Sequence, residues 1–396
     1  MSMTITKRKA RVVAETDIIV VTAVMPCLNE AATVGLCIEK AQQAFARLGI
    51  AGEVVVADNG SSDDSIRIAE SLGARVVREP RKGYGAALMA GMLAARGHIV
   101  VMADADDSYD WGELGDFVCK IEEGYDLVIG NRFRGGILPG AMPPLHRYLG
   151  NPVLSALARV MYRIPIGDFH CGMRALRVEP FGALDIRTPG MEFATEMVVR
   201  AAQGGLRIAE IPTRLYPDKR GRPPHLRSFR DGWRHLRFML TYAPDWLYMI
   251  PGGLMMLAGM AGMALLAAGP IHVGGWSFGI HFLALASLLA LLGANVTGFG
   301  LLARLLNARR NPIWGGSLFG RVLAHFNLER GVLAGVALAA IGLGVDAWIL
   351  SRWIARGFGD MSETVHVAFV GSTTFVLGVN LVFGAFLFNM LHEERK

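Results

Sequence analysis

The sequence predicts an α/β domain with a mainly parallel sheet flanked by helices, followed by an α-helical membrane domain of four spans. Charge density divides the chain: 59 of residues 1–245 are Asp, Glu, Lys or Arg (24%), against 15 of residues 246–396 (10%). A soluble domain usually has about 25%, so only the first part has a soluble composition. Short apolar, β-branched runs alternate there with helical patterns, which is typical of a parallel sheet with helices on both faces.

The α/β domain is expected over residues 18–225, after a polar and basic segment, 1–17, that is expected to be flexible. Its strands are predicted at 18–25, 53–57, 74–78, 98–102 and 126–129, and its helices at about 31–48, 63–72, 84–96 and 112–123. The four cysteines have no metal-binding spacing and are interpreted as reduced thiols.

Residues 226–244 are predicted to form a juxtamembrane amphipathic helix. Its apolar side chains recur at i, i+4, i+7 and i+11 with arginines beside them, in the order Phe229, Arg230, Trp233, Arg234, Leu236, Arg237 and Leu240. A helix of this kind lies in the membrane interface. The alternative is a surface helix packed on the soluble domain.

The transmembrane domain, residues 245–396, is predicted from its apolar runs. No charged residue occurs from Trp246 to Ala303, which is long enough for two spans around a turn at 269–275. We expect spans at about 246–269, 278–303, 331–350 and 365–390, since a bilayer needs about 20 residues. Asp346 is interpreted as an interfacial acid, with a functional intramembrane role as the alternative.

Loop charges predict the orientation of these spans. Residues 304–330 hold five arginines and one acid, whereas the turn at 270–277 is uncharged. By the positive-inside rule that loop and the α/β domain lie in the cytoplasm, and we expect a multi-pass protein of the bacterial inner (plasma) membrane. The net charge of +6 is explained by basic stretches that meet membrane lipid, and no nucleic-acid partner is expected.

Ligands of parallel sheets bind beyond the carboxyl ends of the strands, so the residues at those ends form the candidate site. The first strand ends in Pro-Cys-Leu-Asn-Glu (26–30), without the GxGxxG of a dinucleotide-binding domain. The second ends at Asp58, which is expected to face the cleft. The third unit leads to Arg-Lys-Gly-Tyr-Gly (81–85), where Lys82 beside a helix start indicates a pyrophosphate contact.

The fourth strand ends in Asp104-Ala-Asp106. Two carboxylates at i and i+2 after a buried strand repel each other unless a cation lies between them. Hard oxygen ligands suit Mg²⁺ or Mn²⁺ that also holds a pyrophosphate. An isolated Asp-x-Asp is usually a solvated acidic loop, but its position after a strand, downstream of 26–30 and Asp58, favours the metal site.

In their order, these motifs resemble glycosyltransferase family 2 with the GT-A fold: Met-Pro-x-Leu-Asn-Glu, Val-Val-Ala-Asp-Asn-Gly-Ser, Lys-Gly-Tyr-Gly and Asp-Ala-Asp. The continuation Ile-Gly-Asn-Arg, His-Arg-Tyr-Leu-Gly-Asn and Asp-Phe-His-Cys-Gly-Met-Arg is similar to the polyprenyl-phosphate glycosyltransferases, the dolichyl-phosphate mannose and glucose synthase group. The resemblance implies a metal-dependent hexosyltransferase. It would transfer a hexose with inversion from a nucleotide sugar, most like UDP-glucose, to polyprenyl phosphate.

The resemblance also implies residue roles. The donor-binding residues are Pro26, Asn29, Glu30, Asp58, Lys82 and Asp104, the metal ligands are Asp104 and Asp106, the acceptor-binding residues are Arg132, Arg147 and Asn151, and the catalytic residues are Asp106, Arg132 and Arg147. Relatives often continue the acidic motif with Leu-Gln where this chain has Asp107-Ser108, so the third metal ligand is left open. Asn151 stands where Ser is common.

Alternatives remain open for several of these features. Arg132 and Arg147 could instead form surface salt bridges. The basic segment 214–227 is either a mobile lid or a flexible linker, and Glu192 and Glu196 either reach the sugar or order that lid. The rival functions are a polysaccharide synthase, whose Gln-x-x-Arg-Trp motif is absent, and a membrane transporter with a regulatory nucleotide-sugar-binding domain. A homo-oligomer is also left open.

Overall fold

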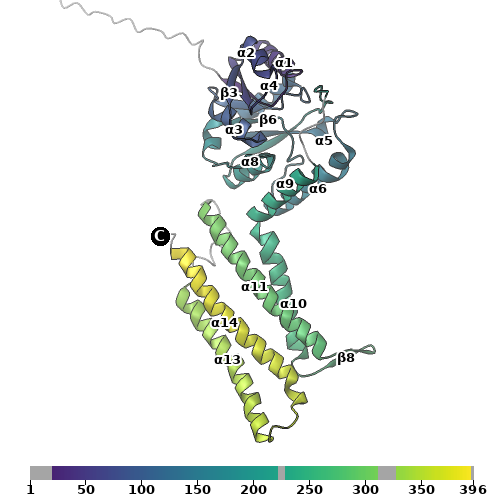
Figure 1. Cartoon of the computed structure of the whole chain (residues 1–396), viewed down its shortest axis with the longest axis vertical. Coiled ribbons are helices and arrows are strands. Elements are labelled where there is room, and N and C mark those ends of the chain that lie inside the picture. Colours follow the sequence, from purple (N-terminus) through teal and green to yellow (C-terminus); the bar gives the residue numbers. More distant parts are fainter. Residues whose placement is uncertain (1–19, 222–227, 311–326, 394–396) are drawn as a thin grey trace, which may run out of the picture. The chain divides into compact units, whose positions relative to one another are not determined.

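The computed structural model describes residues 20–221, 228–310 and 327–393. The chain forms two compact units, residues 1–239 and 240–396 (Figure 1). The division between them falls inside the predicted juxtamembrane helix. The segment 1–17, for which flexibility is expected, lies outside the described residues.

The first unit is built on a seven-stranded sheet with the strand order β3-β2-β1-β4-β6-β5-β7. Strand β6 runs antiparallel to β4 and β5, and the other neighbouring pairs are parallel. A mainly parallel sheet is therefore confirmed, with all five predicted strands. The strands are β1 Val21–Cys27, β2 Gly52–Asp58, β3 Arg75–Arg78, β4 Ile99–Met102, β5 Leu127–Asn131, β6 Arg174–Arg177 and β7 Ile208–Pro212.

The sequence did not predict β6 and β7, because neither has an apolar run. Strand β6 begins with Arg174, which is fully buried and donates to the carbonyl oxygens of Phe169, Cys171 and Ala194 at 2.7, 2.8 and 2.7 Å. A buried arginine satisfied by three carbonyls has no signature in a hydrophobic pattern. Strand β7 ends in Pro212 at the edge of the sheet, where a missing N–H is tolerated.

Helices flank this sheet, as predicted (Figure 1). The four predicted helices are present but one to three residues shorter at an end, because residues 31–33 and 94–96 are turns or irregular and Trp111–Glu113 forms a 3₁₀ turn. Further helices follow in the second half of the unit. The helices are α1 Val34–Leu48, α2 Ser65–Ser71, α3 Tyr84–Leu93, α4 Leu114–Glu122, α5 Arg132–Gly135, α6 Asn151–Tyr162, α7 Val178–Gly182, α8 Phe193–Gln203 and α9 Ser228–Tyr242.

Because helices cover the sheet, its central strands are buried on both faces. Val21, Ala23, Val24 and Met25 of β1 have no exposed surface. Strands buried in this way have continuous apolar sequences, which is why β1 and β4 were predictable. The sheet is thus a rigid platform whose polar residues gather at the strand ends.

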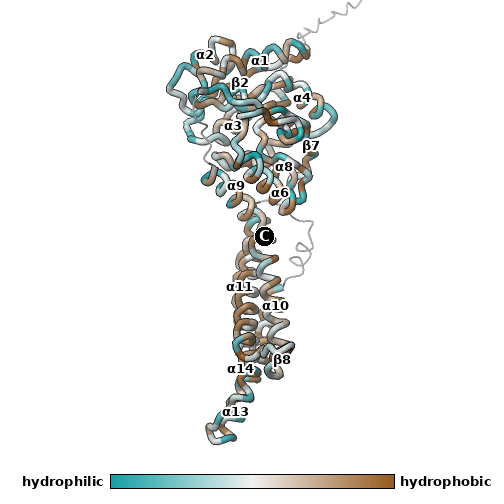
Figure 2. The backbone as a smooth tube through the Cα atoms, turned by 90° about the vertical axis from the view of Figure 1, so that its right-hand side faces the viewer, coloured by the Kyte–Doolittle hydropathy of each residue, from teal (hydrophilic) through white to brown (hydrophobic). Residues whose placement is uncertain are grey.

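Among its described residues, the second unit contains four helices that are long and apolar enough to cross a membrane, at Asp245–Leu266, Ile280–Asn307, Leu328–Ala355 and Ser362–Leu391. Figure 2 shows hydrophobic residues along most of their length. The four predicted spans are confirmed, within about five residues at each end. The expected turn at 269–275 is part of a short hairpin, β8 Ile271–Val273 and β9 Trp276–Phe278. The named helices are α10 Ile250–Leu266, α11 Ile280–Arg310, α13 Leu328–Ala355 and α14 Val365–Glu393.

Glycines allow the membrane helices to pack closely in pairs. A Cβ at Gly259 of α10 would collide with the backbone of Ala290 in α11, and one at Gly342 of α13 would collide with the backbone of Phe375 in α14. Small residues at such crossings are typical of membrane helix pairs. Asp346 of α13 accepts hydrogen bonds from the Ser372 hydroxyl of α14 at 3.2 and 3.3 Å.

The predicted amphipathic helix is present as α9. Its apolar residues do not share one environment: Phe229 and Trp233 are exposed, whereas Leu236 packs against the core of the first unit. Asp231 and His235 lie on the buried side. The helix therefore combines features of both interpretations, with one face packed on the α/β domain and an aromatic face left exposed.

Candidate active site

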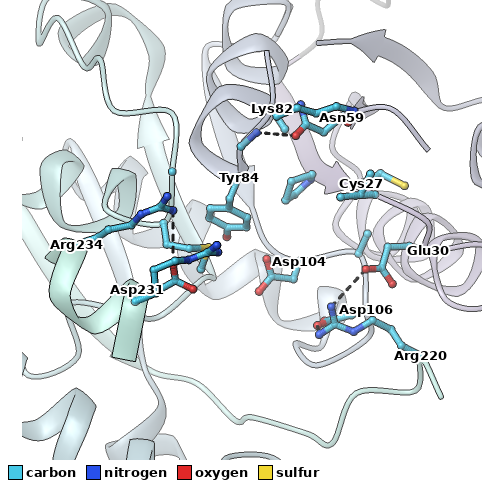
Figure 3. Close-up of a pocket in the computed structure, with 18 residues that line it drawn as sticks. Cys27, Glu30, Asn59, Lys82, Tyr84, Asp104, Asp106, Arg220, Asp231 and Arg234 are labelled. Atoms are coloured by element: carbon cyan, nitrogen blue, oxygen red, sulfur yellow. Dashed lines mark hydrogen bonds and ion pairs between the residues drawn. The ribbon is translucent and has the colours of Figure 1, made fainter. Parts of the chain in front are cut away.

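A cavity of about 410 Å³ opens at the carboxyl ends of β1, β2 and β4 (Figure 3). Residues from these strand ends line the cavity, together with residues from the start of α3, from the segment before α8 and from α9. Its wall is formed by Pro26, Cys27, Leu28, Glu30, Asn59, Lys82, Gly83, Tyr84, Ala87, Asp104, Ala105, Asp106, Gly190, Met191, Arg220, Arg230, Asp231 and Arg234.

Two of the proposed donor-binding residues, Asn29 and Asp58, do not line this cavity. Asp58 is buried and accepts hydrogen bonds from the backbone N–H groups of Gly60 and Ser61, both at 3.0 Å. The side-chain oxygen of Asn29 accepts from the N–H of Ser62 at 2.7 Å. These contacts fix the loop after β2 beside the cavity, while Pro26, Glu30 and Lys82 reach the cavity itself.

Asn59, for which the sequence predicts no separate role, joins this loop to α3. Its amide nitrogen donates to the carbonyl oxygens of Glu79 and Arg81 at 3.0 and 2.8 Å, and its side-chain oxygen accepts from the N–H of Gly83 at 2.7 Å. The ammonium group of Lys82 donates to the Asn59 carbonyl at 2.8 Å. The Lys82 ammonium is thereby held at the cavity wall.

Gly83 is required at this point of the chain. Its φ is +143°, and an added Cβ would collide with the carbonyl oxygen of Pro189. The positive φ of Gly83 and the close approach of the Pro189 carbonyl oxygen both exclude a side chain at this position. The glycine therefore lets the start of α3 pack directly against the segment that carries Gly190 and Met191.

Asp104 and Asp106 both line the cavity, as expected for the acidic motif. Burial, with the neighbouring charge of Asp106, raises the pKa of Asp104 to about 7, while the Tyr84 hydroxyl acts in the opposite direction. A Cβ on Gly172 would come within 2.9 Å of Asp104 Oδ2, so a glycine leaves room for the carboxylate. Asp106 accepts from the N–H of Ser108 at 3.0 Å.

These two carboxylates suit a divalent cation that is shared with a diphosphate. Within residues 20–221, 228–310 and 327–393, no three His, Cys, Asp or Glu side chains converge as a metal site. Mg²⁺ commonly uses one or two carboxylates and completes its shell with phosphate oxygens and water. The donor set therefore fits a metal held partly by its substrate, and Ser108 supplies no third carboxylate or amide ligand.

The basic segment after β7 packs on the acidic loop. Arg220 Nη1 lies 3.3 Å from Glu30 and its Nη2 lies 2.5 Å from Asp106. Lys219 pairs with Asp107 at 2.7 Å. The described part of this segment is thus tied to the acidic loop, as a closed lid would be. Its opening stays a prediction, and residues 222–227 lie outside the described part.

The three predicted acceptor residues are not among those that line the cavity. Arg132 is buried, and its Nε and Nη2 contact the two carboxylate oxygens of fully buried Asp168 at 2.7 and 2.8 Å. Its bidentate fork is thus already filled, by a buried partner rather than in a surface salt bridge. Arg147 is partly exposed in the π-helical turn His146–Gly150, and Asn151 begins α6. Their acceptor role stays a prediction.

Glu196 orders the loop before α8 and does not line the cavity. Its carboxylate accepts from the N–H and hydroxyl of Thr188 at 2.8 and 2.6 Å, and pairs with Arg200 at 3.3 Å. The carboxylate of Glu192 lies close to Gly190, since a Cβ added to Gly190 would collide with Glu192 Oε2. Glu196 therefore helps to order the segment that carries Gly190 and Met191.

Sequence reasoning gave no site role to several cavity residues, among them Asn59, Tyr84, Arg230, Asp231 and Arg234. Tyr84 stands inside the Lys-Gly-Tyr-Gly motif, so its position at the helix start was a usable signal. Arg230 and Arg234 were expected at the membrane interface, because a helical pattern shows which side chains share a face but not which neighbour that face meets.

Comparison with known proteins identifies the family. Residues 22–184 match the model of glycosyl transferase family 2, and residues 301–392 match the glycosyltransferase family 2 C-terminal transmembrane region. The low-salt glycan biosynthesis hexosyltransferase Agl6 of Haloferax volcanii is 36% identical over 384 residues, which cover 96% of this chain and 91% of that protein. The chain belongs to glycosyltransferase family 2.

Two further relatives of this glycosyltransferase have names that specify a lipid phosphate. The dolichyl-phosphate hexose transferase of Haloferax volcanii is 38% identical over 160 residues, covering 40% of this chain and 68% of that protein. The undecaprenyl-phosphate 4-deoxy-4-formamido-L-arabinose transferase of Klebsiella pneumoniae is 28% identical over 315 residues, covering 74% of this chain and 90% of that protein. The predicted family, GT-A fold and membrane domain are confirmed.

Proposed function

We propose that this glycosyltransferase moves a hexose from a nucleotide sugar, most like UDP-glucose, to the phosphate of a polyprenyl phosphate. The observation that carries the proposal is a cavity lined by Glu30, Lys82, Asp104 and Asp106 at the sheet edge of a protein that also has four apolar helices. Two relatives are named as transferases of dolichyl phosphate and undecaprenyl phosphate. Transfer of a sugar to a lipid phosphate would account for both the cavity and the apolar helices.

In this proposal the donor binds along the ends of β1, β2 and β4. Pro26 and Glu30 contact the nucleoside, with Asn29 and Asp58 supporting the loop beside it. Lys82 lies at the start of α3, where a cation and backbone N–H groups favour a diphosphate. The domain limits of the proposal are 18–225 for the catalytic domain, 226–244 for the juxtamembrane helix and 245–396 for the transmembrane domain.

Asp104 and Asp106 would hold Mg²⁺ or Mn²⁺ together with the donor diphosphate. The bound cation would neutralise the charge that develops on the departing nucleoside diphosphate. Support comes from two cavity-lining carboxylates, one buried enough that burial raises its pKa to about 7.

The acceptor needs positioning more than proton transfer, because a lipid monophosphate is already an anion. One of its oxygens bonds to C1 of the sugar while the bond from C1 to the diphosphate breaks, and that electron pair leaves with the nucleoside diphosphate. A single displacement of this kind inverts C1. Cationic side chains align and desolvate the phosphate for the attack. Arg147 and Asn151 remain proposed acceptor residues, and Arg132 is proposed to support them through its pair with buried Asp168 rather than by contacting the phosphate.

The reaction is proposed to occur at the cytoplasmic face of a bacterial inner membrane. The arginines of residues 304–330 support this orientation by the positive-inside rule. Membrane lipid is therefore the third partner beside the donor and acceptor.

The test uses purified full-length protein in detergent with short-chain polyprenyl phosphate and a panel of radiolabelled nucleotide sugars. We expect one sugar to enter the organic phase only when lipid phosphate and a divalent metal are both present. An Asp106→Asn variant is the matched control. Chains longer than one sugar would indicate the polysaccharide synthase, and no transfer from any donor would contradict the proposal.

A further inference from the structure

Helix α9 contributes three charged side chains to the cavity: Arg230, Asp231 and Arg234. In Figure 3, Asp231 and Arg234 lie on the opposite side of Asp104 from Glu30 and Arg220. The helix therefore forms the wall that faces the nucleoside-binding side of the cavity.

The two arginines share one buried carboxylate. Asp231 Oδ1 lies 3.4 Å from Arg230 Nε and 3.6 Å from Arg234 Nη1, and Asp231 itself is buried. The arginine side chains are 50% and 38% exposed. One carboxylate positions two guanidinium groups but neutralises only one positive charge. The group keeps a net charge of about +1 and further N–H donors for an anion.

The same helix has an exposed aromatic face. Phe229 is 86% exposed and Trp233 is 58% exposed, and the helix comes directly before the first apolar span in the sequence. An amphipathic helix with such a face binds at a membrane surface. One element therefore combines aromatic residues suited to lipid with arginines that line the cavity.

We propose that Arg230 and Arg234 bind a phosphate group in this cavity. The inference rests on the proposed function and deepens it, since a phosphate here is either the monophosphate of the lipid acceptor or the diphosphate of the donor. Arginine suits both, because its planar fork donates two parallel hydrogen bonds to phosphate oxygens. Asp231 is a positioning residue that holds the two forks at the wall.

The experiment compares full-length Arg230→Gln and Arg234→Gln with Arg237→Gln in the same lipid nanodiscs. Arg237 is exposed on the same helix and is not among the cavity-lining residues, so it controls for lost charge at the membrane. Each protein is tested for binding of UDP with Mn²⁺, for binding of pyrophosphate alone, and for turnover as a function of polyprenyl phosphate. A lost charge-assisted contact is worth about 1.5–3 kcal/mol, or roughly 10-fold to 150-fold.

We expect a loss of at least about 10-fold in one of these measurements for both cavity variants, and less than about 2-fold for Arg237→Gln. A loss confined to UDP and pyrophosphate binding assigns the donor diphosphate. A loss confined to the lipid dependence assigns the acceptor monophosphate. Wild-type behaviour of both cavity variants in all three measurements overturns the inference. If wild-type protein transfers no sugar to lipid, the proposed function fails, while the two binding measurements still decide whether α9 binds phosphate.

Discussion

Breaking the Arg132–Asp168 pair should destabilise the α/β domain more than it changes substrate recognition. Arg132→Met removes the guanidinium that contacts both oxygens of Asp168 at 2.7 and 2.8 Å. Asp168 has no exposed surface, so its charge stays buried with only weaker contacts to the N–H groups of Arg132 and His170 at 3.2 and 3.3 Å.

Removing one partner of a buried ion pair costs about 3–5 kcal/mol. For a unit of this size, each kcal/mol lowers the melting temperature by about 2–4 °C, so the expected decrease is roughly 6–20 °C. The double variant Arg132→Met, Asp168→Leu should recover much of that loss, because no unpaired charge remains in the core.

The assay is thermal unfolding of the detergent-purified protein, followed by nucleotide binding at a temperature at which both variants are folded. We expect the single variant to melt early and the double variant to bind UDP like the wild type. If the single variant melts like the wild type but needs a much higher polyprenyl-phosphate concentration for turnover, the reasoning is refuted. Arg132 would then contact the acceptor directly.

Further predictions concern the metal, the α3 glycine and the topology. Asp106→Asn should reduce turnover at least about 100-fold while leaving the melting temperature within a few degrees of the wild type. A chelator should abolish wild-type turnover until Mg²⁺ or Mn²⁺ is restored. Full activity in chelator would contradict the metal site. Gly83→Ala should lower both the UDP affinity and the melting temperature, because the φ of +143° and the Pro189 carbonyl exclude a Cβ at this position. Gly182→Ala serves as the control, since the space around Gly182 is open. Cysteines placed in 311–326 on a Cys-free background should resist impermeant thiol reagents in intact cells while one at Val273 reacts; the reverse pattern would invert the topology.

The parts of the fold that depend on continuous local patterns were predictable. Buried parallel strands such as β1 have apolar runs, and the four spans have long uncharged ones. Strand β6 was not predictable, because it begins with Arg174, which is buried against the carbonyl oxygens of Phe169, Cys171 and Ala194 and leaves no trace in a hydrophobic pattern. The hairpin β8–β9 between the first two spans was not predictable either, because short exposed strands have no strong periodicity of apolar residues.

The site was predictable where a motif ends a strand, and less so where it depends on partners distant in sequence. Asp104 and Asp106 follow a buried strand, and the cavity is where the rule for parallel sheets places it. Arg132 appeared open for phosphate because its partner, Asp168, lies 36 residues away. Arg220 is separated from Asp106 by 114 residues, so no local pattern could reveal that they pair.

The central claim is that one hexose is transferred to a lipid phosphate, and mass spectrometry of the lipid product tests it most directly. Purified protein is incubated with UDP-glucose or another active nucleotide sugar, polyprenyl phosphate and Mn²⁺, and the lipid and nucleotide products are quantified together. The account predicts a polyprenyl phosphate heavier by a single hexosyl unit, formed in equal amount to the released nucleoside diphosphate and absent with Asp106→Asn. Nucleotide release with no change in the mass of the lipid would contradict it.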